Sequence, residues 1–331
     1  MIKMKPIFYY LSIIAFFTFA CAKVTDHVAD EIILPYPSIS EQRVSLLNKP
    51  WVTPLRELDS SQIIHDLEYL ASDICEGRKP GTVGHDVAKN YILSQLRAIG
   101  VDSFSSSLEQ TFNGFPMNGT TIGKNLIGWV RGIAFPDKYI VITAHYDHLG
   151  KTEDGKIYNG ADDNASGVAC LLGLAKNFKQ TPHSYSLVFA ALDREETGFE
   201  GAYNFVHLFG LQVGEKNIKF NLNMDMIARS DSNEIYACGL RYYPFYKYLI
   251  EEAQNKTNTG LLMGHDGGTS GRDWKHASDH TAFHQRNIPF LYIGVEDHED
   301  YHATTDDKEK INYSRFIENC NLIHSIIQAI R

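Results

Sequence analysis

The sequence lacks the motifs of several common enzyme classes. It contains no phosphate-binding glycine loop followed by lysine, no dinucleotide fingerprint and no His-Glu-x-x-His pair. The stretch Gly268-Thr-Ser-Gly271 places a serine among glycines, but it does not follow an apolar strand as a nucleophile elbow does. These absences disfavour a serine hydrolase and leave nucleotide-dependent chemistry without a binding motif.

Cysteine and positive charge are also scarce. The five cysteines of the 331-residue chain have no Cys-x-x-Cys spacing. We therefore expect Cys75, Cys170, Cys238 and Cys320 to be buried free thiols, although an exported chain could form a disulfide that the sequence does not reveal. The formal net charge is −9 and no run of basic residues is present, which argues against a nucleic-acid partner.

Outside the N-terminus, no apolar run reaches the length of a membrane span. At the N-terminus, two lysines precede the apolar stretch 7–20, which predicts an export signal. Thr18-Phe-Ala-Cys21 resembles a bacterial lipobox, although Thr18 and Phe19 depart from the usual leucine and small residue. We expect residues 1–20 to be a cleaved lipoprotein signal and Cys21 to be acylated; the alternative is an ordinary signal followed by a chance cysteine.

This interpretation predicts a location in the bacterial cell envelope, on the periplasmic or surface face, with a lipid anchor as the only membrane contact. Loss of residues 1–20 would change the net charge from −9 to −11, because it removes two lysines and no acidic residue. Residues 21–51 contain three prolines and no sustained apolar period, so we interpret them as a tether or arm.

The remaining residues, 52–331, are long enough for one large α/β domain. Strands and helices are expected to alternate, which predicts a mostly parallel, mixed sheet covered by helices on both faces, a three-layer αβα architecture. The expected strands are 125–130, 139–144, 187–192, 218–224, 235–238 and 290–295. One expected helix has its cap at 59–62 and its apolar face at 63–71, and a second ends at residue 99 with apolar positions from 87 onward. The other expected helices are 166–178, 202–209, 245–255 and 313–330.

The stretch 186–201 carries two adjacent glutamates directly after a buried strand. Glu195 and Glu196 cannot point the same way from an extended backbone, so one could hold a cation while the other handles a proton. The alternative is a solvated acidic loop. Histidine and acidic residues follow three further expected strands, and an acidic knot at 159–167 opens a helix. Functional groups of open α/β sheets collect at these carboxyl ends.

So many like charges at one rim would repel each other unless a cation neutralised them. Imidazole and carboxylate without thiolate suit zinc, and to a lesser degree manganese or cobalt. The number of candidate ligands exceeds the three of a single catalytic zinc and fits two metals about 3.5–4 Å apart that share one carboxylate.

Five motifs occur in order along the chain. They are Ala144-His-Tyr-Asp-His148, Gly160-Ala-Asp-Asp-Asn-Ala-Ser-Gly167, Glu195-Glu-x-Gly-x-x-Gly201, Asn223-Met-Asp-Met-Ile227 and Tyr301-His-x-Thr-x-Asp306. Together they resemble the exported di-zinc aminopeptidases, a metallopeptidase family with glutamate carboxypeptidase and glutaminyl cyclase branches. The resemblance covers roughly residues 55–330 and implies a phosphorylase/hydrolase-like fold. Segments 70–81 and 278–289 look like the family's helical entry and the segment beside its substrate pocket.

The resemblance implies two zinc ions per chain. His145 and Asp225 would bind one ion, Glu196 and His302 would bind the other, and Asp163 would bridge them. It also implies a cis peptide bond between Asp163 and Asn164.

Three further residues match catalytic roles in the family. Glu195 matches the general base, Asp147 an acid that orients His145, and Tyr301 a group that stabilises the oxyanion in some relatives. His148 is expected at the pocket edge instead of on a metal. Asp162 and Asp193 are expected to be structural, and Asp279 and His280 either touch the substrate or shape its loop.

The resemblance therefore implies a monomeric zinc aminopeptidase that hydrolyses the N-terminal bond of peptides and proteins. Three alternatives stay open at this point. A carboxypeptidase of the same family would need basic residues for a terminal carboxylate, and Arg229, Arg241 and Arg272 are candidates. A glutaminyl cyclase would release ammonia instead of an amino acid. An inactive peptide-binding ectodomain would keep the fold without the chemistry.

Overall fold

The computed structural model describes residues 37–53, 56–115, 122–230, 232–267 and 272–331. The expected signal segment 1–20, Cys21 and the first part of the tether lie outside the described residues, as does the serine of the stretch 268–271. All described residues belong to one compact unit. None of their helices combines the length and apolarity that crossing a membrane requires.

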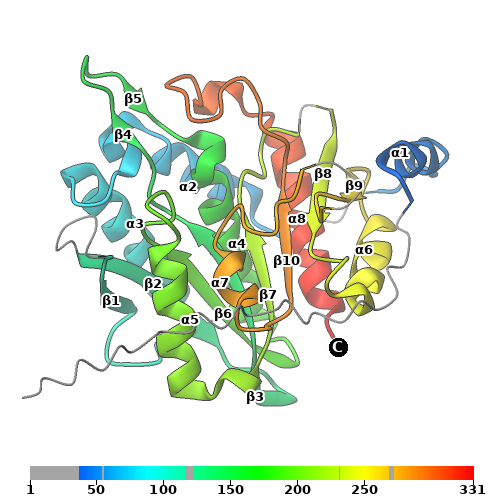
Figure 1. The fold of residues 1–331 in the computed structure, drawn as a ribbon, viewed down its shortest axis with the longest axis horizontal. Coiled ribbons are helices and arrows are strands. Elements are labelled where there is room, and N and C mark those ends of the chain that lie inside the picture. Colours follow the sequence, from blue (N-terminus) through cyan, green and yellow to red (C-terminus); the bar gives the residue numbers. More distant parts are fainter. Residues whose placement is uncertain (1–36, 54–55, 116–121, 231, 268–271) are drawn as a thin grey trace, which may run out of the picture. The chain divides into compact units, whose positions relative to one another are not determined.

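The centre of the fold is an eight-stranded mixed sheet with the order β1-β2-β6-β3-β7-β10-β8-β9 (Figure 1). The four middle strands, β6-β3-β7-β10, are mutually parallel, whereas β1, β2 and β8 pair antiparallel with a neighbour. The strands are β1 Glu109–Asn113, β2 Ile122–Val130, β3 Phe135–His145, β6 Tyr185–Leu192, β7 Ile218–Met224, β8 Glu234–Cys238, β9 Gly260–Met263 and β10 Phe290–Gly294. A separate two-stranded ribbon joins β4 Gly150–Lys151 to β5 Ile157–Tyr158.

Helices cover both faces of the sheet, which confirms the three-layer αβα prediction. The helices are α1 Ile39–Leu47, α2 Ser60–Leu70, α3 Val83–Ile99, α4 Gly167–Gln180, α5 Glu200–Val213, α6 Lys247–Gln254, α7 His280–His284 and α8 Tyr313–Ala329. Successive strand residues alternate between the two faces. Ile140 and Ile142 accordingly join the core of α2, α3, α4, α6 and α8, whereas Val141 joins the core of α5 and α7.

Strands β6, β7 and β10 are buried along almost their whole length, and β3 is buried from Ile140 to His145, as continuous apolar runs predict for strands covered on both faces. The sequence did not predict β1 and β9, which are short and lie at the two edges of the sheet. The four cysteines of the described residues are free and buried, as expected.

Helix α1 lies within the stretch that we interpreted as a tether or arm. Ser38 and Glu41 form a capping box at its N-terminus, which satisfies main-chain groups that the helix leaves free. Ile39 and Leu46 pack against the buried cluster that residues of β8, β9 and β10 form with Trp274. The buried side chain of Gln42 also bonds the main chain of Met263 in both directions, at 2.8 Å. These contacts fix the helix despite its lack of an apolar period.

Candidate metal centre and active site

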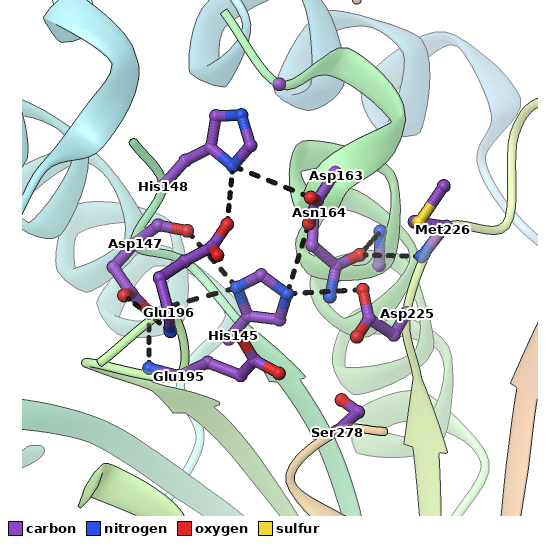
Figure 2. A network of polar contacts seen from close by, with 12 residues as sticks. His145, Asp147, His148, Asp163, Asn164, Glu195, Glu196, Asp225, Met226 and Ser278 are labelled. Carbon is purple, nitrogen blue, oxygen red and sulfur yellow. Dashed lines mark hydrogen bonds and ion pairs between the residues drawn. The ribbon is translucent and has the colours of Figure 1, made fainter. Parts of the chain in front are cut away.

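The strand order places the candidate ligands together. His145 is the last residue of β3, Glu195 and Glu196 follow β6, and Asp225 follows β7. Because β6, β3 and β7 are parallel neighbours, their carboxyl ends meet at one edge of the sheet (Figure 2). Asp163 comes from the turn that precedes α4.

The two carboxylate oxygens of Asp163 face different groups. Oδ1 lies 3.3 Å from Nε2 of His145, which is also 3.1 Å from Oδ1 of Asp225. Oδ2 lies 3.2 Å from Nε2 of His302, which is 3.4 Å from Oε2 of Glu196. The fold therefore brings the five predicted ligands together. Asp163 lies between the pair His145 and Asp225 and the pair Glu196 and His302. The peptide bond between Asp163 and Asn164 is cis, as the resemblance implied.

The protonation pattern around His145 fits a bound cation. Nδ1 donates a hydrogen bond to the main-chain oxygen of Asp147 at 3.1 Å, so the neutral ring presents a lone pair at Nε2. That lone pair faces carboxylate oxygens of Asp163 and Asp225. The Nε2 lone pair and the two carboxylate oxygens are all acceptors, so a cation must lie between them. That cation is either a second proton on the ring or a metal ion.

The donor set also fits two metal ions. Donor atoms of His145, Glu195 and Asp225 lie within 4.8 Å of one another, and those of His148, Asp163 and Glu196 form a second such group. All these atoms are imidazole nitrogens or carboxylate oxygens, which suits zinc. The carboxylates are buried, so their mutual repulsion is weakly screened and a pair of dications would offset it.

Glu195 is buried beside these ligands, with 8% of its surface exposed. Burial, opposed by His145 and reinforced by the negative charges of Asp225 and Asp279, raises the pKa of its carboxyl well above the ordinary value. A raised pKa brings a carboxyl closer to the range in which it can both accept and return a proton near neutrality. Geometry and pKa therefore suit Glu195 to proton transfer.

Asp147 connects the strand of His145 to the two glutamates. One carboxylate oxygen accepts a hydrogen bond from the main-chain amide of Glu195 at 3.0 Å, and the other accepts from that of Glu196 at 3.3 Å. Its carboxylate is 3.8 Å from Nδ1 of His145, whereas its carbonyl is 3.1 Å away. The main-chain carbonyl of Asp147 therefore lies closer to the ring of His145 than its carboxylate does.

The site opens into a pocket. Its wall beyond the ligands is partly apolar, with Met226, Trp274, Tyr292 and Val295. Tyr301 lines the same pocket and stacks on the ring of His302, with ring centroids 3.9 Å apart. Tyr301 is 39% exposed, although it stacks on this ring.

The structure also clarifies the residues near the motifs. His148, expected at the pocket edge, is buried, and its Nδ1 lies 2.8 Å from Oε1 of Glu196 and 3.7 Å from Oδ2 of Asp163. Asp162 accepts a hydrogen bond from the amide of Ala228, and Asp193 contacts the ring of His85. Sequence reasoning did not indicate that Arg78 or Trp274 would adjoin the site, since neither has a fixed spacing to a ligand motif.

Comparison with known proteins identifies the family of the chain. The profile of Peptidase family M28 matches residues 125–327, more than half of the chain, and the protein belongs to this family. Aminopeptidase YwaD of Bacillus subtilis is 28% identical over 214 residues, which are 62% of this chain and 44% of YwaD. YfbL of Escherichia coli, an uncharacterized protein, is 26% identical over 308 residues, 82% of this chain and 89% of YfbL. The chain also matches the alkaline phosphatase isozyme conversion protein of Escherichia coli and covers 48% of its length. It therefore spans less than half of the length of this relative and of YwaD.

Solved structures show the same fold. A leucine aminopeptidase precursor from Bacteroides thetaiotaomicron has a TM-score of 0.69 at 18% identity, with 85% of this chain and 100% of that chain covered. A glutaminyl cyclase from the same organism has a TM-score of 0.68 at 18% identity, with 84% and 100% covered. The chain is thus a metallopeptidase of Peptidase family M28, and its fold is shared by an aminopeptidase precursor and a glutaminyl cyclase.

Proposed function

We propose that this protein is a zinc-dependent aminopeptidase that hydrolyses the N-terminal bond of peptides. The observation that carries the proposal is the position of Asp163. One of its carboxylate oxygens faces His145 and the other faces His302, and Glu195 is buried beside these residues. Membership of Peptidase family M28 and the similarity to an aminopeptidase support the reaction class.

The residues have separate duties in this proposal. His145 and Asp225 would hold one zinc ion, Glu196 and His302 would hold the other, and Asp163 would contribute to both positions. Bound zinc supplies a water of lowered pKa and polarises the substrate carbonyl. The apolar pocket wall around Trp274, Met226 and Val295 would exclude bulk water from the N-terminal residue of the substrate.

Glu195 acts as the general base. Its carboxylate takes the proton of the attacking water and returns it to the departing amine, as hydrolysis of an amide requires. The hydrogen bond from its amide to Asp147 fixes the start of the side chain, and burial keeps the proton from exchanging with solvent. We assign to Tyr301, which lines the pocket beside His302, the donation of its hydroxyl hydrogen to the oxyanion that forms on the substrate carbonyl.

A panel of free-amino aminoacyl amides, N-acetylated amides and peptides, assayed with and without chelator, tests the function. We expect hydrolysis of the free-amino substrates only, its loss on chelation and its return with zinc. Cleavage of C-terminal residues from N-acetylated peptides would contradict an aminopeptidase and favour a carboxypeptidase. No turnover of any substrate by the zinc-loaded protein would favour an inactive binding ectodomain.

The cyclase alternative needs its own assay because the fold is shared. A peptide with N-terminal glutamine yields free glutamine when hydrolysed and ammonia when cyclised. We expect free amino acid from the purified enzyme. Ammonia release without free glutamine would identify a glutaminyl cyclase instead.

We also propose that the chain is exported and acts as a monomer, anchored to the cell envelope through an acylated Cys21, with residues 52–331 as its one catalytic domain. The sequence of the N-terminal 21 residues supports export. Mass spectrometry of the N-terminal peptide from membrane fractions tests the anchor. A soluble protein with an unmodified Cys21 would contradict it.

A further inference from the structure

Arg78 is a charged residue that the proposed chemistry does not use. Its side chain is completely buried, with 0% exposure. Among the described residues, no carboxylate forms an ion pair with it within 4.0 Å, in contrast to the buried pairs Arg194–Glu200 and Arg229–Asp300. Burying a guanidinium without a paired acid is costly unless every donor is satisfied. The hydrogen-bond partners of Arg78 therefore decide whether its burial is tolerated.

Each N–H group of the guanidinium has its own acceptor, and all five acceptors are main-chain carbonyls. An arginine side chain has five N–H donors in a planar fork, so the set is complete. Nε donates to Tyr146 at 2.9 Å, Nη1 to Leu70 at 2.7 Å and to Asn159 at 2.6 Å, and Nη2 to Gly160 at 2.9 Å and to Asp163 at 3.2 Å.

These carbonyls belong to three separate segments. Leu70 ends helix α2, and Tyr146 directly follows His145 at the end of β3. The other three lie in the turn that carries Asp163. One planar group therefore connects the turn of the bridging carboxylate to the strand end of a metal ligand. The main-chain oxygen of Arg78 adds a link, because it accepts a hydrogen bond from the amide of His148 at 3.2 Å.

The backbone that delivers Arg78 is sterically disfavoured. Glu76 and Arg78 have φ values of 47° and 49°, in the left-handed region that residues with a Cβ rarely adopt. Between them, a Cβ on Gly77 would lie 2.3 Å from the carbonyl oxygen of Gly150 and 2.5 Å from that of Tyr158. Such local strain persists where the surrounding structure requires it and clusters at functional sites.

We propose that Arg78 is a positioning residue that holds the Asp163 turn at a fixed distance from His145, so that the two zinc positions exist before zinc binds. The inference rests on the proposed zinc site. Lysine offers three donors and glutamine two, and neither reproduces a planar fork. Substitution should therefore weaken zinc binding in proportion to the carbonyls left without a donor.

The test measures zinc dissociation constants by competition with a chromophoric chelator for the wild type, R78K, R78Q and L249A. Leu249 is a fully buried core residue on α6, so L249A is a control for general destabilisation. We expect R78K to weaken zinc binding about 10- to 100-fold, as loss of groups that orient metal ligands does, and R78Q to weaken it further. L249A should lower the melting temperature but stay within about 2-fold of the wild-type dissociation constants.

Unchanged zinc affinity in R78K, with only a lower melting temperature, would overturn the proposal and leave Arg78 a purely structural role. A wild-type protein that binds no zinc would instead refute the proposed function. Hydrogen exchange on the zinc-free wild type keeps the test valid if the variants do not fold. The amides of Asp162 and Asp163, which donate to Asp306, should be protected without zinc. Free exchange of these amides in the zinc-free protein would show that the turn is not held in advance.

Discussion

The carboxylate of Asp147 accepts a hydrogen bond from the main-chain amide of Glu195 at 3.0 Å, although the two residues lie on different strand ends. The second oxygen of Asp147 binds the next amide, that of Glu196, at 3.3 Å. Through this contact the end of β3 sets the direction in which the glutamate pair leaves β6. The proposed base and one proposed ligand thus depend on a residue that touches neither zinc position.

Replacing Asp147 by alanine should lower kcat by about 10- to 100-fold, because the amides of both glutamates lose their acceptor and the base loses its orientation. Steady-state kinetics on an aminoacyl amide measure the effect. D154A is a suitable control, since Asp154 is exposed on the turn between β4 and β5 and pairs with Lys156. Equal kinetics for D147A and D154A would remove Asp147 from the machinery.

Replacing Glu195 by glutamine should lower kcat by about 10²- to 10⁴-fold, the usual contribution of general acid–base catalysis. The amide side chain is nearly isosteric but cannot accept the proton of the attacking water. Zinc content, measured by elemental analysis after dialysis, should remain near two ions per chain. Substantial activity in E195Q would assign the base to another residue.

Replacing Glu196 by alanine should lower the zinc content of the protein, in contrast to E195Q. Removal of one carboxylate leaves the second position with fewer donors, so zinc content should fall from two ions towards one per chain. E195Q and E196A are matched, because they change adjacent glutamates on the same loop. An equal loss of zinc in the two variants would show that the assigned division between base and ligand is wrong.

The acid sensitivity of stability should depend on His324 in α8. Burial, with a contribution from Lys256, lowers the pKa of His324 to about 4, and its Nε2 lies 2.9 Å from Oδ1 of Asn177. The unfolded chain, with an ordinary pKa of about 6.5, binds the proton first. The contribution of His324 to stability is therefore complete above pH 6.5 and is lost as the pH falls from there to about 4.

Urea unfolding of the zinc-free protein at pH 7 and at pH 4.5 measures this loss. Zinc-free protein is required because metal release would otherwise contribute in the same pH range. H324Q keeps a donor for Asn177 but does not titrate, so it should lose on the order of 2 kcal/mol less stability than the wild type over this interval. An identical loss in both proteins would assign the acid sensitivity to other groups.

Much of the sheet could be predicted because its middle strands are continuous apolar runs. β6 and β7 begin and end close to the expected residues, and their burial on both faces produces that signal. Helix α1 was not predicted, because it has no apolar stripe and the tertiary contact of Gln42 with Met263 carries no sequence signal. The capping box of Ser38 and Glu41 was the sequence signal that could have found it. The edge strand β9 is also set by its neighbour, because it pairs with β8 at the end of the sheet.

The sequence by itself determined the chemical identity of the site. Histidine and carboxylate residues directly follow apolar strands that alternate with helices along the chain. Such alternation predicts parallel strands, whose carboxyl ends meet at one edge of the sheet. Only the tertiary structure decided which atoms face each other: the opposite directions of the two oxygens of Asp163, the contact of His148 with Glu196, and the five carbonyls around Arg78. The physical reason is that main-chain acceptors carry no sequence signal. A carbonyl is the same group in every residue, and only folding determines which ones converge on a buried charge.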